Sequence, residues 1–263
     1  MVEVIEITDS QADEHIARHF GRCPIVVQLP TVFAVVAPAT HAGAHLLDRC
    51  KDRLPGKYYS VLIGDLARFL RLSTGTALSE YLLDSTRPDR IDAFARDLES
   101  TFLRSQVAAR ICSSRTLCEG RLQGLILGGL LNEKMRLMES LSEKLPGRLF
   151  GPEHGRYCAP IASSCNMSGD PDGSIDDFGR ALDFAKRRGV GLVLTNPSGE
   201  GGGSNPILGI CGAEVETLRE GPGESEKRRL LERWLCRARG CQAQKSAPYV
   251  TPVDHQASFP ASA

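Results

Sequence analysis

Short apolar runs alternate with amphipathic segments at both ends of this 263-residue chain. Apolar runs of about four to eight residues indicate buried strands, whereas apolar residues spaced three and four apart indicate helices. The pattern predicts strands at residues 2–7, 25–29, 32–37, 58–63, 190–194, 207–211 and 214–218. It predicts helices at residues 11–20, 41–50, 66–72, 174–188 and 224–237, with Ser10, Thr40, Asp65 and Ser174 at their starts. Alternation of the two kinds of element predicts an α/β fold with a mixed sheet.

The middle of the chain follows a different pattern. Ile91, Phe94, Leu98 and Phe102 recur at helical spacing, so residues 74–150 are expected to be mostly helical. The apolar run at 124–131 fits a strand equally well. Residues 241–263 are rich in Ala, Ser and Pro and are expected to form a disordered tail. The expected organisation is therefore one domain at 1–240, with a helical middle at about 74–150.

Composition narrows the class of protein. Apolar residues make up 41% and charged residues 24%, and the net charge is zero, so no overall field attracts nucleic acid or membrane. No apolar run approaches the roughly 20 residues of a membrane span. The nine cysteines contain no C-x-x-C pair, and the first residues lack a signal-peptide pattern. Reduced thiols and a cytoplasmic location are expected.

Three polar segments could carry chemistry. The first holds Lys51, Arg53 and Lys57, whose cations suit a polyphosphate, although cations also favour helix ends. The second, at 163–169, places small hydroxyl and amide side chains between a strand and a helix, where open α/β sheets bind ligands. An ordinary capped turn is the alternative there. The third is the glycine-rich stretch 201–206, followed by Arg219, which could equally be a surface loop.

Other patterns favour a structural role. The pairs His15/His19 and His41/His45 have zinc-like i, i+4 spacing, but no third ligand stands out, so solvated histidines are expected. No Walker A loop or G-x-S-x-G elbow occurs. Arginines at 228, 229, 233, 237 and 239 indicate the solvent-facing side of the last helix, with an RNA contact as the alternative.

Taken in order, these segments resemble the YrdC-like family of threonylcarbamoyl-AMP synthases. The resemblance covers about residues 11–72 and 156–222. It rests on Leu29-Pro30-Thr31-Val32-Phe33, Lys51-Asp52-Arg53 with Lys57, Ser163-Ser164-Cys165-Asn166-Met167-Ser168-Gly169, Ser204-Asn205-Pro206-Ile207 and Arg219-Glu220-Gly221. It implies a single domain built on a twisted, mostly mixed open sheet flanked by helices.

The resemblance also implies an activity. Family members condense ATP, bicarbonate and L-threonine into threonylcarbamoyl-adenylate and release pyrophosphate, and the product feeds tRNA modification. It implies that Lys51 and Arg53 are catalytic. The implied ATP-binding residues are Lys51, Arg53, Lys57, Ser164, Asn166 and Arg219, and the implied substrate-binding residues are Thr31, Phe33, Ser164 and Ser204. Mg²⁺ would accompany ATP, held largely by phosphate oxygens and water rather than by a protein metal site.

Several positions depart from the family pattern. The Asp-Thr pair that follows Pro-Thr in the family is missing, and Phe33 stands where the family has Tyr. Tyr58 replaces a proline, and Asn205 replaces a threonine. Loss of a substrate-binding hydroxyl can change discrimination by about 10⁴. The first hypothesis, a carbamoyl-adenylate synthase, therefore includes an amine other than threonine as a possible substrate. The second hypothesis is a non-catalytic protein that binds nucleotide or RNA.

Overall fold

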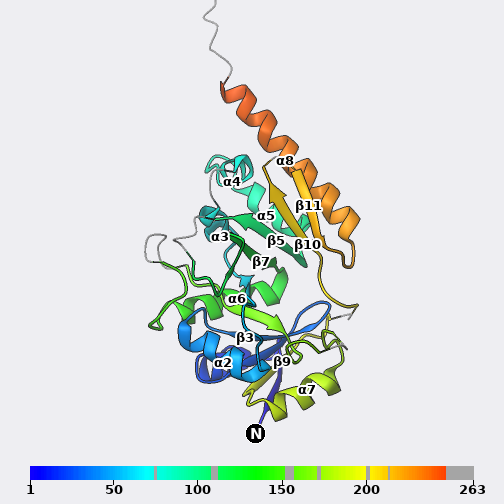
Figure 1. Cartoon of the computed structure of the whole chain (residues 1–263). Helices are drawn as coiled ribbons and strands as arrows, with labels where there is room; N and C mark the ends of the chain where they lie inside the picture. Colours follow the sequence, from blue (N-terminus) through cyan, green and yellow to red (C-terminus); the bar gives the residue numbers. More distant parts are fainter. Residues whose placement is uncertain are drawn as a thin grey trace, which may run out of the picture.

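One mixed sheet of eleven strands runs through the protein (Figure 1). The computed structural model describes residues 1–73, 76–107, 112–151, 157–170, 173–199, 202–212 and 214–246. The strands are β1 (Glu3–Glu6), β2 (Ile25–Gln28), β3 (Phe33–Ala37), β4 (Ser60–Ile63), β5 (Thr101–Gln106), β6 (Leu117–Cys118), β7 (Arg121–Ile126), β8 (Ile161–Ser164), β9 (Leu192–Thr195), β10 (Ile207–Cys211) and β11 (Glu214–Arg219). Their order is β1-β9-β2-β3-β8-β4-β7-β5-β10-β11, and β6 pairs with β7.

Helices cover the sheet on both faces. They are α1 (Ala12–His19), α2 (His41–Lys51), α3 (Leu66–Leu72), α4 (Ala77–Leu82), α5 (Asp89–Asp97), α6 (Gly129–Ser142), α7 (Phe178–Arg187) and α8 (Glu224–Ser246). Side chains from α2, α3, α4, α5, α7 and α8 join one buried cluster, whereas α1 and α6 pack in a second. Because neighbouring residues of a strand point to opposite faces, Phe33 and Val35 enter the first cluster and Ala34 and Val36 the second.

The middle segment contains strands as well as helices, which corrects the mostly helical prediction for 74–150. β5, β6 and β7 extend the sheet, with β4 parallel to β7 and β5 antiparallel to β7. The helical spacing that begins at Ile91 ends with α5, and Phe102 lies on β5. Ser100 adopts a left-handed φ of 61° between the two elements and separates them. The ambiguous run at 124–131 divides between β7 and α6.

Two of the predicted helix caps are confirmed, and two others are wrong. The side chain of Thr40 accepts a hydrogen bond from Gly43 N, and that of Asp65 accepts one from Arg68 N, as predicted. Ser174 does not begin α7, because Asp177 accepts from Arg180 N at 2.8 Å and is the cap. Likewise Ser10 is not the cap of α1: Gln11 holds that position.

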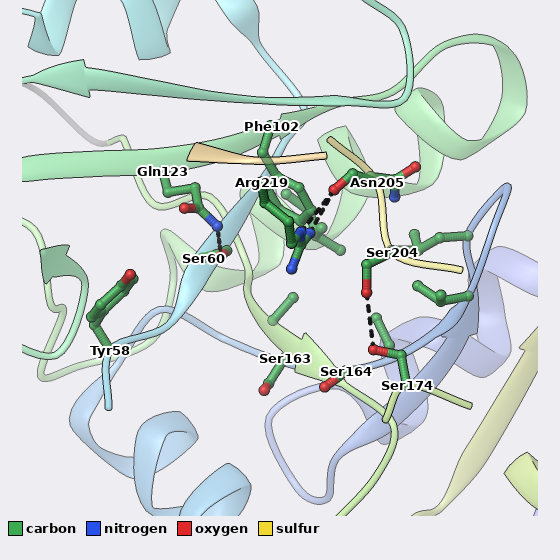
Figure 2. A pocket seen from close by; sticks show the side chains of 15 residues that line it. Tyr58, Ser60, Phe102, Gln123, Ser163, Ser164, Ser174, Ser204, Asn205 and Arg219 are labelled. Carbon is green, nitrogen blue, oxygen red and sulfur yellow. Dashed lines mark hydrogen bonds between the residues drawn. The ribbon is translucent and has the colours of Figure 1, made fainter. Parts of the chain in front are cut away.

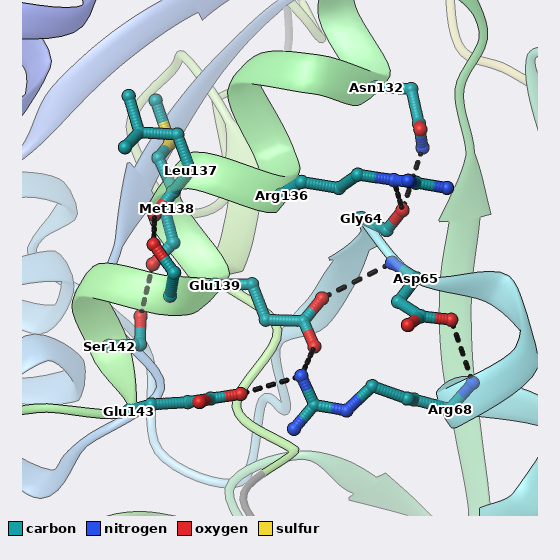
Figure 3. Close-up of polar contacts among 11 residues, drawn as sticks. Gly64, Asp65, Arg68, Asn132, Arg136, Leu137, Met138, Glu139, Ser142 and Glu143 are labelled. Carbon is teal, nitrogen blue, oxygen red and sulfur yellow. Dashed lines mark hydrogen bonds and ion pairs between the residues drawn. The ribbon is translucent and has the colours of Figure 1, made fainter.

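A buried polar junction joins α6 to the end of β4 and the start of α3 (Figure 3). Glu139 is 2% exposed, and its carboxylate accepts from Asp65 N at 3.2 Å and from Arg68 Nη1 at 2.7 Å. Burial raises the pKa of Glu139 to about 7, despite the Arg68 ion pair. Gly64 permits the close approach, since a Cβ there would lie 2.8 Å from the main-chain nitrogen of Arg136.

The last helix is longer than predicted. α8 continues to Ser246, so the predicted boundary at 241 falls inside a helix, and residues 247–263 lie outside the described residues. Leu231 and Trp234 are buried, and Trp234 Nε1 donates to Asp97 Oδ2 at 2.8 Å. The arginines at 228, 229, 233, 237 and 239 are exposed, as expected for a solvent-facing side. In the part of the chain that the structure describes, no helix is both long and apolar enough to cross a membrane.

Candidate functional site

A cavity of about 170 Å³ lies against the sheet face that carries Ala34 and Ala162 (Figure 2). Strands β3, β4, β5, β7, β8 and β11 contribute to it, together with the loops that contain Ser174, Ser204 and Asn205. The lining residues are Leu29, Val32, Ala34, Tyr58, Ser60, Leu62, Phe102, Gln123, Ala162, Ser163, Ser164, Ser174, Ser204, Asn205 and Arg219. The volume is below the roughly 300–1,000 Å³ of drug-sized ligand sites, so the cavity suits a small molecule.

Positive charge dominates this cavity. Arg219 lines it, and the described lining residues include no Asp or Glu. Two further guanidinium groups lie behind the wall: Arg53 Nη1 donates to Ser163 Oγ at 3.0 Å, and Arg104 Nη2 donates to Tyr58 OH at 2.9 Å. Burial lowers the pKa of Arg53 and of Arg219. Three arginines without a lining carboxylate favour an anionic ligand.

Lys51 lies behind the 163–169 segment and not in the cavity wall. It is 2% exposed, and its ammonium donates to the main-chain oxygens of Ser164 and Asn166 and to Asn166 Oδ1 at 3.2 Å. Burial, with the nearby Arg53 charge second, lowers the pKa of Lys51 to about 8. Its three N–H donors therefore hold the loop in shape, and its contact with ATP phosphates stays a prediction.

Arg53 and Lys57 differ in what they can reach. Arg53 stacks over the Tyr59 ring at 4.0 Å and also donates to the main-chain oxygen of Tyr58, so its plane is fixed beside the cavity. Lys57 is exposed in the loop before β4. The structure thus brings Arg53 to the edge of the cavity, through Ser163, and leaves Lys57 at the surface.

The 163–169 segment contributes hydroxyl groups at the end of β8. Ser163 and Ser164 line the cavity, and Ser164 Oγ donates to Asn166 Oδ1 at 2.5 Å. Asn166 is 9% exposed and is engaged by Lys51 and Ser164, so it supports the wall from behind. Among the predicted ATP-binding residues, Ser164 and Arg219 reach the cavity directly.

Of the predicted substrate-binding residues, some line the cavity and others lie outside it. Ser204 lines the cavity and lies 3.2 Å from Ser174 through their hydroxyl oxygens. Thr31 is buried, and its hydroxyl donates to Asn205 Oδ1 at 3.0 Å, so it acts through Asn205. Phe33 is a correction: it is 1% exposed, belongs to the opposite face of the sheet, and packs 6.4 Å from the Phe178 ring.

Several lining residues were missed by the sequence prediction. Phe102 and Gln123 lie on β5 and β7, in the segment predicted to be mostly helical. Ser60 accepts a hydrogen bond from Gln123 Nε2 at 2.7 Å, across two strands that are distant in sequence. The alternation of β4, which places Ser60 and Leu62 on one face, was the available signal. Ser174 was read as a helix cap instead.

The two histidine pairs lie in different surroundings. His15 and His19 both contact Glu3 on β1, which corrects the expectation of solvated rings, whereas His41 and His45 are exposed. Among the described residues, no group of three or more His, Cys, Asp or Glu side chains could hold a metal ion.

No family model and no curated protein sequence matches this chain. Solved structures share its fold, among them two of Sua5 and one of YciO. P. abyssi Sua5 complexed with L-threonine has a TM-score of 0.59 at 14% identity, covering 84% of this chain and 57% of that one. A doubly substituted P. abyssi Sua5 has 0.58 at 15%, covering 84% and 60%. E. coli YciO has 0.59 at 11%, covering 87% and 98%.

The chain covers different shares of the solved structures that share its fold. This chain spans about three fifths of the length of the Sua5 structures and nearly all of YciO. Identities of 11–15% relate the folds and not the activities. The cavity, the mixed sheet and these three comparisons together confirm that the chain has the YrdC-like fold of Sua5 and YciO, which the sequence resemblance implies.

Proposed function

We propose that this protein uses ATP and bicarbonate to convert a small amine, L-threonine first among the candidates, into a carbamoyl-adenylate, with release of pyrophosphate. The proposal rests on one observation, which is that residues from separate segments of the chain meet in one cavity. Ser164, Ser204 and Arg219 come from three separate segments that resemble YrdC-like motifs, and all three line one cavity. A protein of the same fold has been solved with L-threonine.

The size and charge of the site suggest separate positions for the amine and for the triphosphate. The cavity accommodates the amine substrate, and the triphosphate extends over its rim toward Arg53 and Ser163. ATP brings Mg²⁺, bound by phosphate oxygens and water. Lys51 holds the main chain of Ser164 and Asn166 in place and is a positioning residue in this proposal.

The chemistry requires positioning and charge neutralisation more than proton transfer by side chains. Bicarbonate takes up a proton and loses water to give CO₂. The neutral amine then adds to CO₂ and gives up one proton, so a carbamate forms and water is the net by-product. A carbamate oxygen then attacks the α-phosphorus of ATP, the bond to the β-phosphate breaks, and pyrophosphate departs. Arg53 and Arg219 stabilise the negative charge that gathers at these anions.

Pyrophosphate release tests the proposal. We expect it to require ATP, bicarbonate and one amine from a panel of amino acids. Arg53→Ala should lower kcat/KM by about 10²–10³, because one oriented charged donor is lost. Arg228→Ala, on the exposed side of α8, is the matched control and should leave turnover unchanged. Circular dichroism should confirm that both variants fold.

The binding-only hypothesis makes the opposite prediction. If no amine stimulates pyrophosphate release while calorimetry detects ATP or structured RNA, the synthase proposal is wrong. RNA binding whose affinity falls steeply with salt, without turnover, would identify a nucleic-acid-binding protein.

A further inference from the structure

A second cavity, of about 340 Å³, is lined by the loop before β2, by α2 and by the residues that follow α7. The described residues that line it are all different from those of the candidate site. They include the thiols of Cys23 and Cys50 and the guanidinium groups of Arg22, Arg49 and Arg188, and no Asp or Glu is among them. The cavity therefore combines thiols with a positive charge.

The thiol of Cys23 lies beside a histidine that can take its proton. Cys23 Sγ lies 3.6 Å from Nδ1 of His19, four residues earlier, and 3.7 Å from the main-chain oxygen of His19. Nε2 of the same ring lies 3.3 Å from Glu3 Oε2 on β1. A carboxylate at Nε2 favours the tautomer that carries its proton there, which leaves Nδ1 free to accept a proton. Thiol, imidazole and carboxylate thus follow the order of an activated cysteine nucleophile.

Glu3 is itself held in place by a second histidine. Nδ1 of His15 lies 2.5 Å from the carboxylate oxygen that faces His19. The hydrogen bond from His15 is the main cause that lowers the pKa of Glu3, so its carboxyl group stays ionised. An ionised and fixed carboxylate keeps the orientation of the His19 ring.

Gly191 permits the close approach of these groups. A Cβ at this position would lie 2.6 Å from His19 Nδ1 and closer still to Cys23 Sγ. Burial raises the pKa of the Cys23 thiol, and the main-chain N–H of Gly191 and the charge of Arg22 oppose this rise. The resting thiol is therefore protonated, and transfer of the proton to His19 makes the sulfur nucleophilic.

The two thiols of the cavity differ in what they can reach. Cys50 is 2% exposed, and burial raises its pKa to about 11, so it forms an unreactive part of the wall. Cys23 is half-buried and faces both the histidine and the cavity.

Two of the three arginines are available to a ligand. Arg188 Nε donates to the main-chain oxygen of Cys50 at 2.6 Å, and its Nη2 pairs with Asp52 at 2.8 Å. Arg22 and Arg49 are exposed. Guanidinium groups bind carboxylates through paired hydrogen bonds, so these two arginines favour a reagent that carries carboxylates.

We propose that Cys23 is a site of thiol–disulfide exchange with small disulfides that carry carboxylates, oxidised glutathione being the representative. His19 takes the proton of the thiol, and the thiolate attacks one sulfur of the disulfide. A new S–S bond forms to Cys23, the S–S bond of the reagent breaks, and the departing thiolate takes the proton from His19. One disulfide is consumed and one is formed, so no other oxidant is required.

The test follows formation of the mixed disulfide on the reduced full chain by peptide-mapped mass spectrometry, without ATP, bicarbonate or amine. Dithiodipropionate, oxidised glutathione and cystamine are added separately, and initial rates are measured at Cys23 and Cys211. Cys211 is exposed, and its neighbour Arg121 pairs with Glu216, so Cys211 is the internal reference. Relative to Cys211, Cys23 should favour dithiodipropionate over cystamine by about tenfold. A preference no larger than that of Cys211 overturns the proposal.

His19→Ala removes the proton acceptor. It should slow the reaction of Cys23 by about 10²-fold with all three disulfides and leave Cys211 unchanged. Imidazole added to the buffer should restore part of the rate, which a purely structural role of His19 would not produce. His41→Ala, exposed at the start of α2, is the matched control and should react as wild type does. An unchanged rate at Cys23 in His19→Ala contradicts the proposal.

Glu3→Gln tests the orienting carboxylate, and it keeps the proposal testable if His19→Ala fails to fold. The rate at Cys23 should fall with all three disulfides, by a smaller factor than in His19→Ala. Glu3→Asp keeps the charge and should recover part of the rate. Equal rates in Glu3→Gln and wild type would show that Glu3 does not orient the base.

Replacement of Arg22 and Arg49 by Gln separates charge recognition from activation. The double variant should lose most of the preference for the two carboxylate reagents, while its reaction with cystamine is not slowed. A preference that survives in the double variant would show that these arginines do not bind the reagent.

Discussion

At the scale of single residues, Lys51 shows how burial changes a predicted role. Its ammonium is surrounded by oxygen atoms of Ser164 and Asn166, and these contacts join α2 to the end of β8. A lysine that served phosphate alone would contribute little to stability. The position of Lys51 therefore predicts a structural effect that can be measured without substrate.

We expect Lys51→Met to lower the free energy of unfolding by about 1–3 kcal/mol, because three buried acceptors lose their partner. Urea denaturation checks the value. Lys57→Met, in the exposed loop, should leave stability within about 0.5 kcal/mol of wild type. Equal stability of Lys51→Met and wild type would show that the ammonium is not needed by the loop.

At the scale of elements, α7 distinguishes two possible caps. Asp177→Ala should lower stability by about 1 kcal/mol, because the Arg180 N–H loses its acceptor. Ser174→Ala should not weaken α7, since Ser174 contacts Ser204 at the cavity. Thermal unfolding of the two variants compares them, and a larger loss in Ser174→Ala would contradict this assignment.

The junction between α6 and α3 predicts a pH dependence. Burial raises the pKa of Glu139 to about 7 from an ordinary value of 4.5. The folded state therefore binds this proton more tightly than the unfolded state. The stability that Glu139 contributes is complete below pH 4.5 and is lost as the pH rises to about 7. A shift of this size corresponds to roughly 3 kcal/mol.

Glu139→Gln removes the titration and keeps an acceptor for Asp65 N. Urea titrations at intervals from pH 4.5 to 8 should show a smaller loss of stability with rising pH in this variant than in wild type. Glu133→Gln, exposed on the same helix, should keep the wild-type slope. Identical slopes in all three proteins would mean that Glu139 titrates normally.

At the scale of the whole molecule, α8 belongs to the same folded unit as the sheet. The only tryptophan, Trp234, donates to Asp97 and packs edge-on against Phe94 at 5.7 Å. Tryptophan fluorescence and far-ultraviolet circular dichroism should therefore report one coincident unfolding transition. An earlier fluorescence transition would show that α8 unfolds separately. Leu231→Ala should shift both signals together, with a loss of about 2–5 kcal/mol.

The sequence predicted what depends on neighbours along the chain. The strands β2, β3 and β9 are buried on both faces, so each is a continuous apolar run that indicates a strand. Thr40 and Asp65 cap helices through contacts three residues away. β5 was missed, because its buried positions include the polar Thr101 and Ser105, while Phe102 continues the helical spacing of α5.

The candidate site was only partly predictable, for a physical reason. Serine, arginine and lysine in the motif segments indicate anion chemistry from residue type alone, and Ser164, Ser204 and Arg219 do line the cavity. Which face a side chain occupies depends on strand register. Register placed Phe33 in the core and brought Gln123 into the cavity.

By itself, the sequence determined the α/β class, most strand positions and the YrdC-like resemblance, because hydrophobic period and local capping act over a few residues. Only the tertiary structure decided which polar groups meet. Thr31 and Asn205 are 174 residues apart, yet their side chains form a hydrogen bond at the cavity wall. That pairing arises from the packing of the whole sheet, which no local pattern encodes.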